Sequence, residues 1–301
     1  MLKEKRLPCL FQLFVEDTMT GNRAIRILFM LFVVSVFVGR GQACAETREE
    51  QVVATIQTVP EHITTGTPTT IFFSIRDRQG RPITDLTVMH DRLIHVVIAS
   101  QDFSVFAHIH PQDFGPITPE MKKMARYQVK FTFPKAGSYI VGIDFAVSGR
   151  SVSKHFLVHV TGGPEMAHPK KDLTREKIFG GLDVRFSSKP EHITAGKKTV
   201  LTYRFTEKGR PVTDLQPYLA APMHLAVISE DLTHFMHTHG ELPGMPHMGH
   251  DEESMQMTVP EKFGPELEVH LVFPSKGLYQ IFGQVRHKDK VILTSFMVEV
   301  D

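Results

Sequence analysis

The chain has 301 residues, of which 42% are hydrophobic, a length and composition that suit about two globular domains. Its 34 Lys and Arg balance 33 Asp and Glu, which excludes the strongly basic surface expected of a nucleic-acid-binding protein. Seventeen His and fourteen Met stand against only two Cys, so a soft-metal site in this chain has to be built from imidazole and thioether groups.

The N-terminal segment, residues 1–45, is predicted to be a secretory signal. Arg23 precedes a short apolar run at 27–38, which is too short to span a bilayer, and a small-x-small cleavage site ends at Ala45. Met19 is an alternative start. Two other interpretations stay open: a lipoprotein acylated at Cys44, and an uncleaved membrane anchor. The signal predicts a periplasmic or secreted bacterial protein whose only membrane contact is this segment.

The rest of the chain is an internal duplication. VPEHITTG at 59–66 returns as KPEHITAG at 189–196, and similar pairs follow to the end of each copy. The repeat is far longer than the repeats of solenoid proteins, so it indicates two domains. We place domain 1 at 46–161, a polar linker at 162–178 and domain 2 at 179–301.

Each copy consists of short β-branched and aromatic segments separated by Gly, Pro and Asp. The segment TTIFFSI at 69–75 is typical, and Gln79-Gly80 has the composition of a hairpin turn. One short helix is expected near 119–127. The fold class is therefore all-β, with two tandem immunoglobulin-like β-sandwich domains, and a closed barrel is the alternative.

The most informative stretch in domain 1 is LIHVVIASQDFSVFAHIHP, residues 93–111. A turn centred between Gln101 and Asp102 would place His95 opposite His108, with His110 on the same face of the hairpin. The other face is wholly apolar and suited to a sandwich core. Three imidazoles on one face can converge on one metal ion, whereas a shift of one residue would scatter them over both faces.

The same pattern returns at a constant offset of 129 residues, in MHLAVISEDLTHFMHTHGE at 223–241. Two separate metal sites are therefore predicted, one in each domain. The ligands are His95, His108 and His110 in domain 1, and His224, His237 and His239 in domain 2. The competing interpretation is that these histidines are only structural.

Domain 2 adds a Met- and His-rich stretch at 240–257, which is predicted to form a capture loop over the second site. Imidazole and thioether together suit copper better than zinc, and no organic cofactor is indicated. The candidate additional ligands are Met223, Met245, His247, Met248 and His250.

The two His stretches, each followed by Phe-Pro-x-x-Gly-x-Tyr (FPKAGSY at 133–139 and FPSKGLY at 273–279), resemble the YtkA-like family of secreted bacterial β-sandwich domains. The resemblance covers nearly all of both domains. It implies an immunoglobulin-like fold, an envelope location and a link to copper handling. Domain 1 departs from the pattern at Ile94, where domain 2 has Met223, which weakens a copper site in domain 1.

The sequence thus predicts an extracytoplasmic metal-binding protein, a copper carrier, chaperone or resistance factor, with zinc as the second choice of ion. Its expected partners are the ion and either an envelope metalloprotein or a membrane transporter. No hydrolase motif or Cys nucleophile occurs, so we expect no enzyme activity. Two alternatives remain: a structural or adhesive envelope module, and a copper-dependent redox enzyme of the superoxide dismutase type.

Overall fold

The computed structural model describes residues 51–244 and 259–301, all of which belong to one compact unit, Glu46–Asp301. The predicted signal segment lies outside these residues. So do four of the predicted ligands, Met245, His247, Met248 and His250.

The first half of this unit is built from strands, with two short helical segments. The strands are β1 (Val52–Val59), β2 (Ile63–Thr64), β3 (Pro68–Asp77), β4 (Leu86–Thr87), β5 (Ile94–Ser100), β6 (Phe106–Ile109), β7 (Arg126–Thr132), β8 (Gly137–Val147) and β9 (Arg150–Thr161). The helical segments are η1 (Pro111–Phe114) and α2 (Pro119–Met124), and α2 confirms the single helix expected near 119–127.

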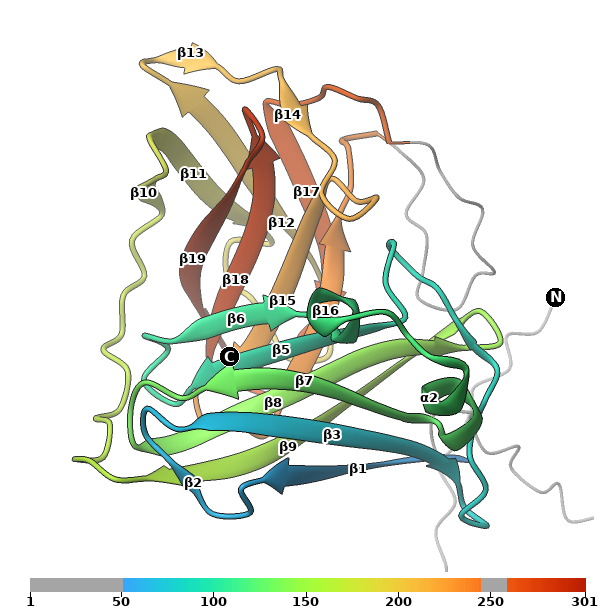
Figure 1. Ribbon diagram of the computed structural model, residues 1–301. Coiled ribbons are helices and arrows are strands. Elements are labelled where there is room, and N and C mark those ends of the chain that lie inside the picture. The colour runs from blue at the N-terminus through green and yellow to red at the C-terminus, as the bar shows by residue number, and fades with distance from the viewer. Residues whose placement is uncertain (1–50, 245–258) are drawn as a thin grey trace, which may run out of the picture. The chain divides into compact units, whose positions relative to one another are not determined.

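The second half repeats the pattern without a described helix (Figure 1). Its strands are β10 (Glu176–Phe179), β11 (Leu182–Lys189), β12 (Lys198–Glu207), β13 (Arg210–Pro211), β14 (Leu215–Gln216), β15 (Met223–Ser229), β16 (Phe235–Gly240), β17 (Glu266–Val272), β18 (Gly277–His287) and β19 (Lys290–Val300).

Each half forms two sheets, as expected of an immunoglobulin-like sandwich. In domain 1 the order β1-β3-β7 faces the order β2-β9-β8-β5-β6, in which β4 also pairs with β8. In domain 2 the order β10-β11-β12-β13, with β17 on β12, faces β14-β18-β15-β16, with β19 on β18. The fold is all-β with two tandem sandwiches, as predicted. Among the described residues, no helix has the length and apolar character needed to cross a membrane.

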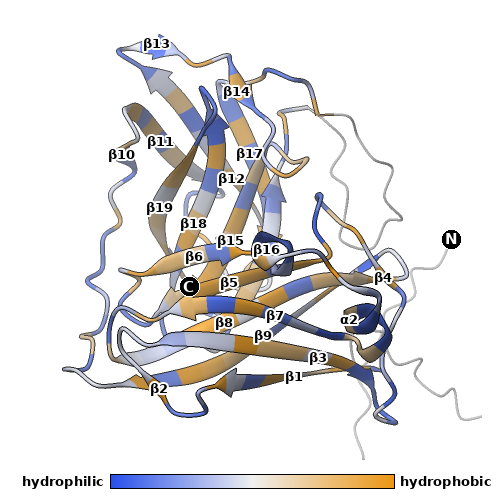
Figure 2. Ribbon diagram, in the orientation of Figure 1, coloured by the Kyte–Doolittle hydropathy of each residue, from blue (hydrophilic) through white to orange (hydrophobic). Residues whose placement is uncertain are grey.

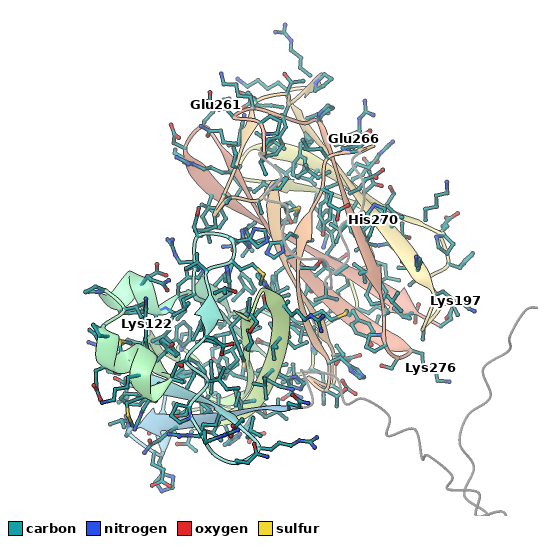
Figure 3. All side chains as sticks on the ribbon, turned by 90° about the vertical axis from the view of Figure 1, so that its right-hand side faces the viewer. Lys122, Lys197, Glu261, Glu266, His270 and Lys276 are labelled. Atoms are coloured by element: carbon teal, nitrogen blue, oxygen red, sulfur yellow. The ribbon has the colours of Figure 1, made fainter. Side chains whose placement is uncertain are left out.

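Alternation of apolar and polar residues along the strands explains why each pair of sheets closes (Figure 2). In β3, for example, Ile71, Phe73 and Ile75 are fully buried in the core of domain 1, while the residues between them are less buried. Domain 2 has a separate core of the same kind. Charged side chains such as Lys122 and Lys276 project outward from the domains (Figure 3).

The repeated Phe-Pro-x-x-Gly-x-Tyr segment fixes the start of β8 and of β18. The hydroxyl of buried Tyr139 donates to the carbonyl of Lys135 at 2.9 Å, and Tyr279 donates to the carbonyl of Ser275 at 3.0 Å. Gly137 takes a φ of 122°, which a residue with a Cβ rarely adopts. This arrangement resembles the tyrosine corner of immunoglobulin domains.

One predicted boundary needs correction. β10 begins at Glu176, inside the segment 162–178 that we expected to be a linker. It forms because Glu176 to Phe179 pair antiparallel with β11. Lys171, within the same segment, also forms an ion pair with Glu299 of β19 at 2.7 Å.

The register of the His hairpin differs from the prediction by two residues. His108 lies opposite Val97, not opposite His95, and in domain 2 His237 lies opposite Ala226. The predicted two-residue turn was too short, because four residues, 101–104, lie between the paired strands. Asp102 stabilises this longer turn by accepting hydrogen bonds from Ser100 and Ser104. A shift of two preserves the faces, because side chains alternate with a period of two.

The face that carries the His residues does not meet solvent. Its apolar members from domain 1, such as Val97 and Ala99, form one buried cluster with Ala226 and Ile228 of domain 2. Phe103 and Leu232, which lie in the turns of the two hairpins, belong to the same cluster. The two domains therefore pack through their His-bearing faces.

Close packing at this interface yields a first prediction. A Cβ on Gly142 would overlap the ring of Phe235, which belongs to the other domain. We expect Gly142→Val to destabilise the protein by about 1–3 kcal/mol, as overpacking does. Gly163→Ala is the control, since its Cβ would only touch Ala136 at 3.6 Å. Urea unfolding measures both, and equal stability of the two variants would contradict this packing.

Candidate metal centre between the domains

The histidines predicted to form two sites are brought together at one place. His95 and His108 of domain 1 and His224 and His237 of domain 2 each present one ring nitrogen, and these four atoms lie within 4.8 Å of one another. The prediction of two separate sites is therefore corrected. Sequence periodicity placed the residues on the right faces, but the packing of those faces makes the two sets one cluster.

His95 and His224 are the central-strand members, from β5 and β15. Nε2–H of His95 donates to the carbonyl of Met89 at 3.1 Å, and Nε2–H of His224 donates to the carbonyl of Tyr218 at 3.0 Å. A carbonyl oxygen only accepts, so each ring keeps its proton on Nε2 and turns an Nδ1 lone pair inward. Both residues are only 1% exposed.

His108 and His237 come from the edge strands β6 and β16, and each is held by the opposite domain. Nδ1–H of His237 donates to Oδ2 of Asp144 at 3.1 Å, and Nδ1 of His108 lies 2.7 Å from Oε1 of Gln284. Asp144 and Gln284 occupy equivalent positions, opposite His95 and His224 in their sheets. Two equivalent contacts between the domains therefore support the site, one from each domain to a histidine of the other.

The two contacts differ in chemistry. Asp144 is 1% exposed and also accepts hydrogen bonds from Ser151 at 2.9 Å and Ser153 at 2.6 Å. Its carboxylate fixes a proton of His237 on Nδ1, so Nε2 is the nitrogen that faces the other rings and could bind an ion. Gln284 carries both an acceptor and a donor, so it is compatible with either tautomer of His108.

The inward nitrogens face one another with little to satisfy them. His224 Nδ1 and His237 Nε2 are buried and have no hydrogen-bond partner. His95 Nδ1 lies 3.1 Å from His108 Nε2. Zn–N bonds of about 2.0–2.1 Å to four tetrahedral nitrogens would separate neighbouring nitrogens by about 3.4 Å. A metal ion would therefore satisfy lone pairs that are otherwise buried at a cost.

The four rings are evenly spaced. All six separations between ring centroids of His95, His108, His224 and His237 fall between 4.9 and 5.6 Å. Equal separations define a tetrahedron, whereas a square-planar set would have two separations longer than the other four by a factor of about 1.4. The arrangement is tetrahedral.

Burial favours the neutral form of His95, His108 and His224, the state in which histidine binds metal. Burial lowers the pKa of His95 to about 2, and a proton on His95 would in addition be repelled by a proton on His237 or His108. For the same reasons the pKa values of His108 and His224 lie well below the usual range. Burial alone would raise the pKa of Asp144, but the hydrogen bond and charge of His237 outweigh burial and hold that pKa below its usual value.

The other two predicted imidazole ligands flank the four. His110 lies 5.0 Å from His95 and 4.7 Å from His108, between ring centroids, and its Nδ1 contacts Asp113 at 3.0 Å. His239 lies in the same way beside His224 and His237, at 4.6 and 4.9 Å. Neither belongs to the set of four.

The prediction that Met223 is a ligand is wrong. Its side chain is fully buried in the core of domain 2, with its methyl group over Gly283. As the neighbour of His224 on a strand, it points to the opposite face of the sheet.

Sequence reasoning missed three residues of the site: His90, Asp144 and Gln284. His90 stacks on His239 with ring centroids 3.7 Å apart, but nothing in the sequence separates it from an isolated surface histidine. Asp144 and Gln284 did carry a signal. Each interrupts an apolar strand at the same place in the two copies, in GIDF at 142–145 and FGQV at 282–285.

Asp144 gives a second prediction. Replacing Asp144 by Asn keeps the shape of the side chain but allows either tautomer of His237. Loss of such a supporting contact to a metal ligand typically lowers metal affinity by roughly 10–100-fold. We expect Asp144→Asn to weaken binding by about that factor in a competition titration. Ser151→Ala, which removes only one hydrogen bond to Asp144, is the control. An unaltered affinity in Asp144→Asn would contradict the role of this carboxylate.

The fold and the site together define a tandem immunoglobulin-like β-sandwich protein with a buried histidine cluster between its domains. The chain belongs to the family described as a domain of unknown function (DUF8832), which it matches twice, at residues 49–162 and 177–301. A search of curated proteins found no match.

Solved structures show only distant likeness. The Escherichia coli adhesin FdeC is 12% identical over 82% of this chain and 64% of its own, with a TM-score of 0.24. The bacterial integrin-binding protein invasin is 10% identical over 81% of this chain and 39% of its own, with a TM-score of 0.21. The chain thus spans less than two thirds of either structure. Similarity at this level carries no argument about what the chain binds.

Proposed function

We propose that this chain is a metal-binding protein that holds one divalent ion between its two domains. The ligands are His95 Nδ1, His108 Nε2, His224 Nδ1 and His237 Nε2. The observation that carries the proposal is the tetrahedron of four imidazoles, two from each domain. Two of its four inward nitrogens are buried without a hydrogen-bond partner, and the other two have only each other. The predicted signal segment supports an extracytoplasmic location.

The geometry favours zinc over copper. Zn(II) has no geometric preference of its own and is almost always tetrahedral in four-coordinate protein sites. Cu(II) prefers a square-planar or tetragonal set, which would require the tetrahedron to flatten. Cu(I) accepts a tetrahedral site but prefers sulfur ligands, and Met223 lies on the other face of its sheet. The copper expected from the sequence and from the YtkA-like resemblance is therefore our second choice.

The test is a titration of the purified metal-free protein with Zn(II), Cu(II) and Co(II). We expect one ion per chain, and an intense visible absorption with Co(II), which marks tetrahedral coordination. At a free zinc concentration 100 times the dissociation constant, binding should stabilise the fold by about 2.7 kcal/mol. If no ion binds at micromolar concentration, the cluster is structural and the chain is an envelope module without a metal.

A further inference from the structure

The two flanks of the four-His site differ in how they meet solvent. On the domain 1 flank, His110 is only 2% exposed and its ring is held by Asp113. On the domain 2 flank, His239 is partly exposed. The Nε2 atoms of His110 and His239 are both buried without a hydrogen-bond partner, so the two flanks differ in exposure and in the contact with Asp113. Of these two equivalent residues, His110 is enclosed and held by Asp113, whereas His239 is in part accessible to solvent. We call the domain 1 side the closed flank and the domain 2 side the open flank.

A further imidazole lies on the open flank alone. His90 sits in the turn between Met89 and Arg92 with a φ of 49°, and its ring lies 3.7 Å from that of His239 and 5.6 Å from that of His224. Domain 2 has an equivalent turn with the same φ of 49° at Leu219, which carries no metal ligand. His90 is partly exposed.

These positions form a continuous path of imidazoles. His90 is next to His239, and His239 is next to two of the four ligands, His224 and His237. His108 is also partly exposed, but it is itself one of the four, so an ion leaving there would have to displace a ligand. Stepwise transfer of an ion requires intermediate positions that bind it well enough to accept it and weakly enough to release it.

We propose that His90 and His239 form an outer metal-binding position through which a divalent ion passes between solvent and the four-His site. The inference rests on the proposed function. His239 offers the inward step, since its ring contacts both the outer imidazole and the inner ligands. His90 offers the outer step and exists in only one of the two domains, which makes the path one-sided.

The test compares exchange rates in His90→Leu and His239→Leu, each measured by mixing with Zn(II) and a fluorescent zinc indicator. Leu is the residue that domain 2 has at the position of His90. We expect association and dissociation rates to fall together by about tenfold, which corresponds to about 1.4 kcal/mol added to the barrier in both directions. The dissociation constant should stay the same. His110→Leu, on the closed flank, should exchange zinc as the wild type does.

The outcomes separate the two proposals. Absence of zinc from the wild-type protein would refute the proposed function. Normal zinc binding with unaltered rates in both His90→Leu and His239→Leu would refute the outer position alone. Loss of equilibrium affinity in His239→Leu, to the level of a His237 variant, would make His239 a ligand of the inner site and would also overturn the proposal.

Discussion

Replacing His95 and His108 by Ala is expected to abolish metal binding by the whole chain, although domain 2 keeps all its histidines. Each domain supplies only two of the four ligands, so neither half of the site is complete without the other. Two imidazoles that remain after the substitution leave the ion half-coordinated, whereas structural zinc sites use four ligands. The paired variant with Ala at His224 and His237 should behave identically.

Equilibrium dialysis with zinc, followed by metal analysis, measures this directly. A control variant replaces His62 and His192 by Ala. It too lacks two histidines, but both are exposed and lie outside the cluster, so this variant should still bind one ion. Retention of one ion by each paired site variant would show that the domains bind metal independently, as the sequence alone suggested. That result would refute the shared site.

The fold was predictable because the sequence signals that define it are local. Alternation along segments such as 69–75 specifies strands, and a turn such as Gln79-Gly80 specifies how two strands connect. Gly80 indeed has a φ of 78°, and in domain 2 the equivalent turn at Lys208-Gly209 joins Glu207 to its partner Arg210. Duplication then repeated the same signals with different residues, which strengthened each of them.

The histidine register was only half predictable. Alternation gave the correct face for His95 and His108, but the length of the turn depends on hydrogen bonds that Asp102 makes with Ser100 and Ser104. Such side-chain contacts with a turn are not visible as periodicity. Since the error was two residues, the faces survived it.

The shared site was beyond the reach of local patterns, because it depends on which surfaces of two domains pack together. A hint was available: the His-bearing face also carries Val97, Ala99 and Phe106, an apolar set that is unusual on a face in contact with water. In the structure Phe106 stacks on Phe282 of domain 2, with ring centroids 4.3 Å apart. Burial of this patch is what brings the two sets of imidazoles together.

The metal-free protein is expected to lose stability steeply as the pH falls from about 6.5 to about 4. Burial lowers the pKa of His90 and of His110 to about 4, and that of His95 to about 2, with smaller effects from neighbouring charges. Asp113 partly opposes the shift at His110, and Asp144 partly opposes the shift at His90. In the unfolded chain these imidazoles take up protons below a pH of about 6.5.

The sign follows from where the protons bind. Between pH values of about 6.5 and 4 the unfolded chain binds protons that the folded chain does not, so acid favours unfolding and stability rises with pH in this window. Each histidine that titrates only in the unfolded chain contributes about 1.4 kcal/mol per pH unit. Several buried histidines act together, so the expected slope is a multiple of this value.

Urea unfolding of the metal-free protein at a series of pH values measures the slope. The variant with Leu at both His95 and His224 should show a shallower dependence, because two buried imidazoles no longer resist protonation. The same variant should be the more stable protein at a pH of about 5, since leucine fills the space without an unsatisfied ring nitrogen. A stability that is independent of pH in the wild type would contradict the burial of neutral imidazoles. The histidines therefore weaken the empty interface in acid.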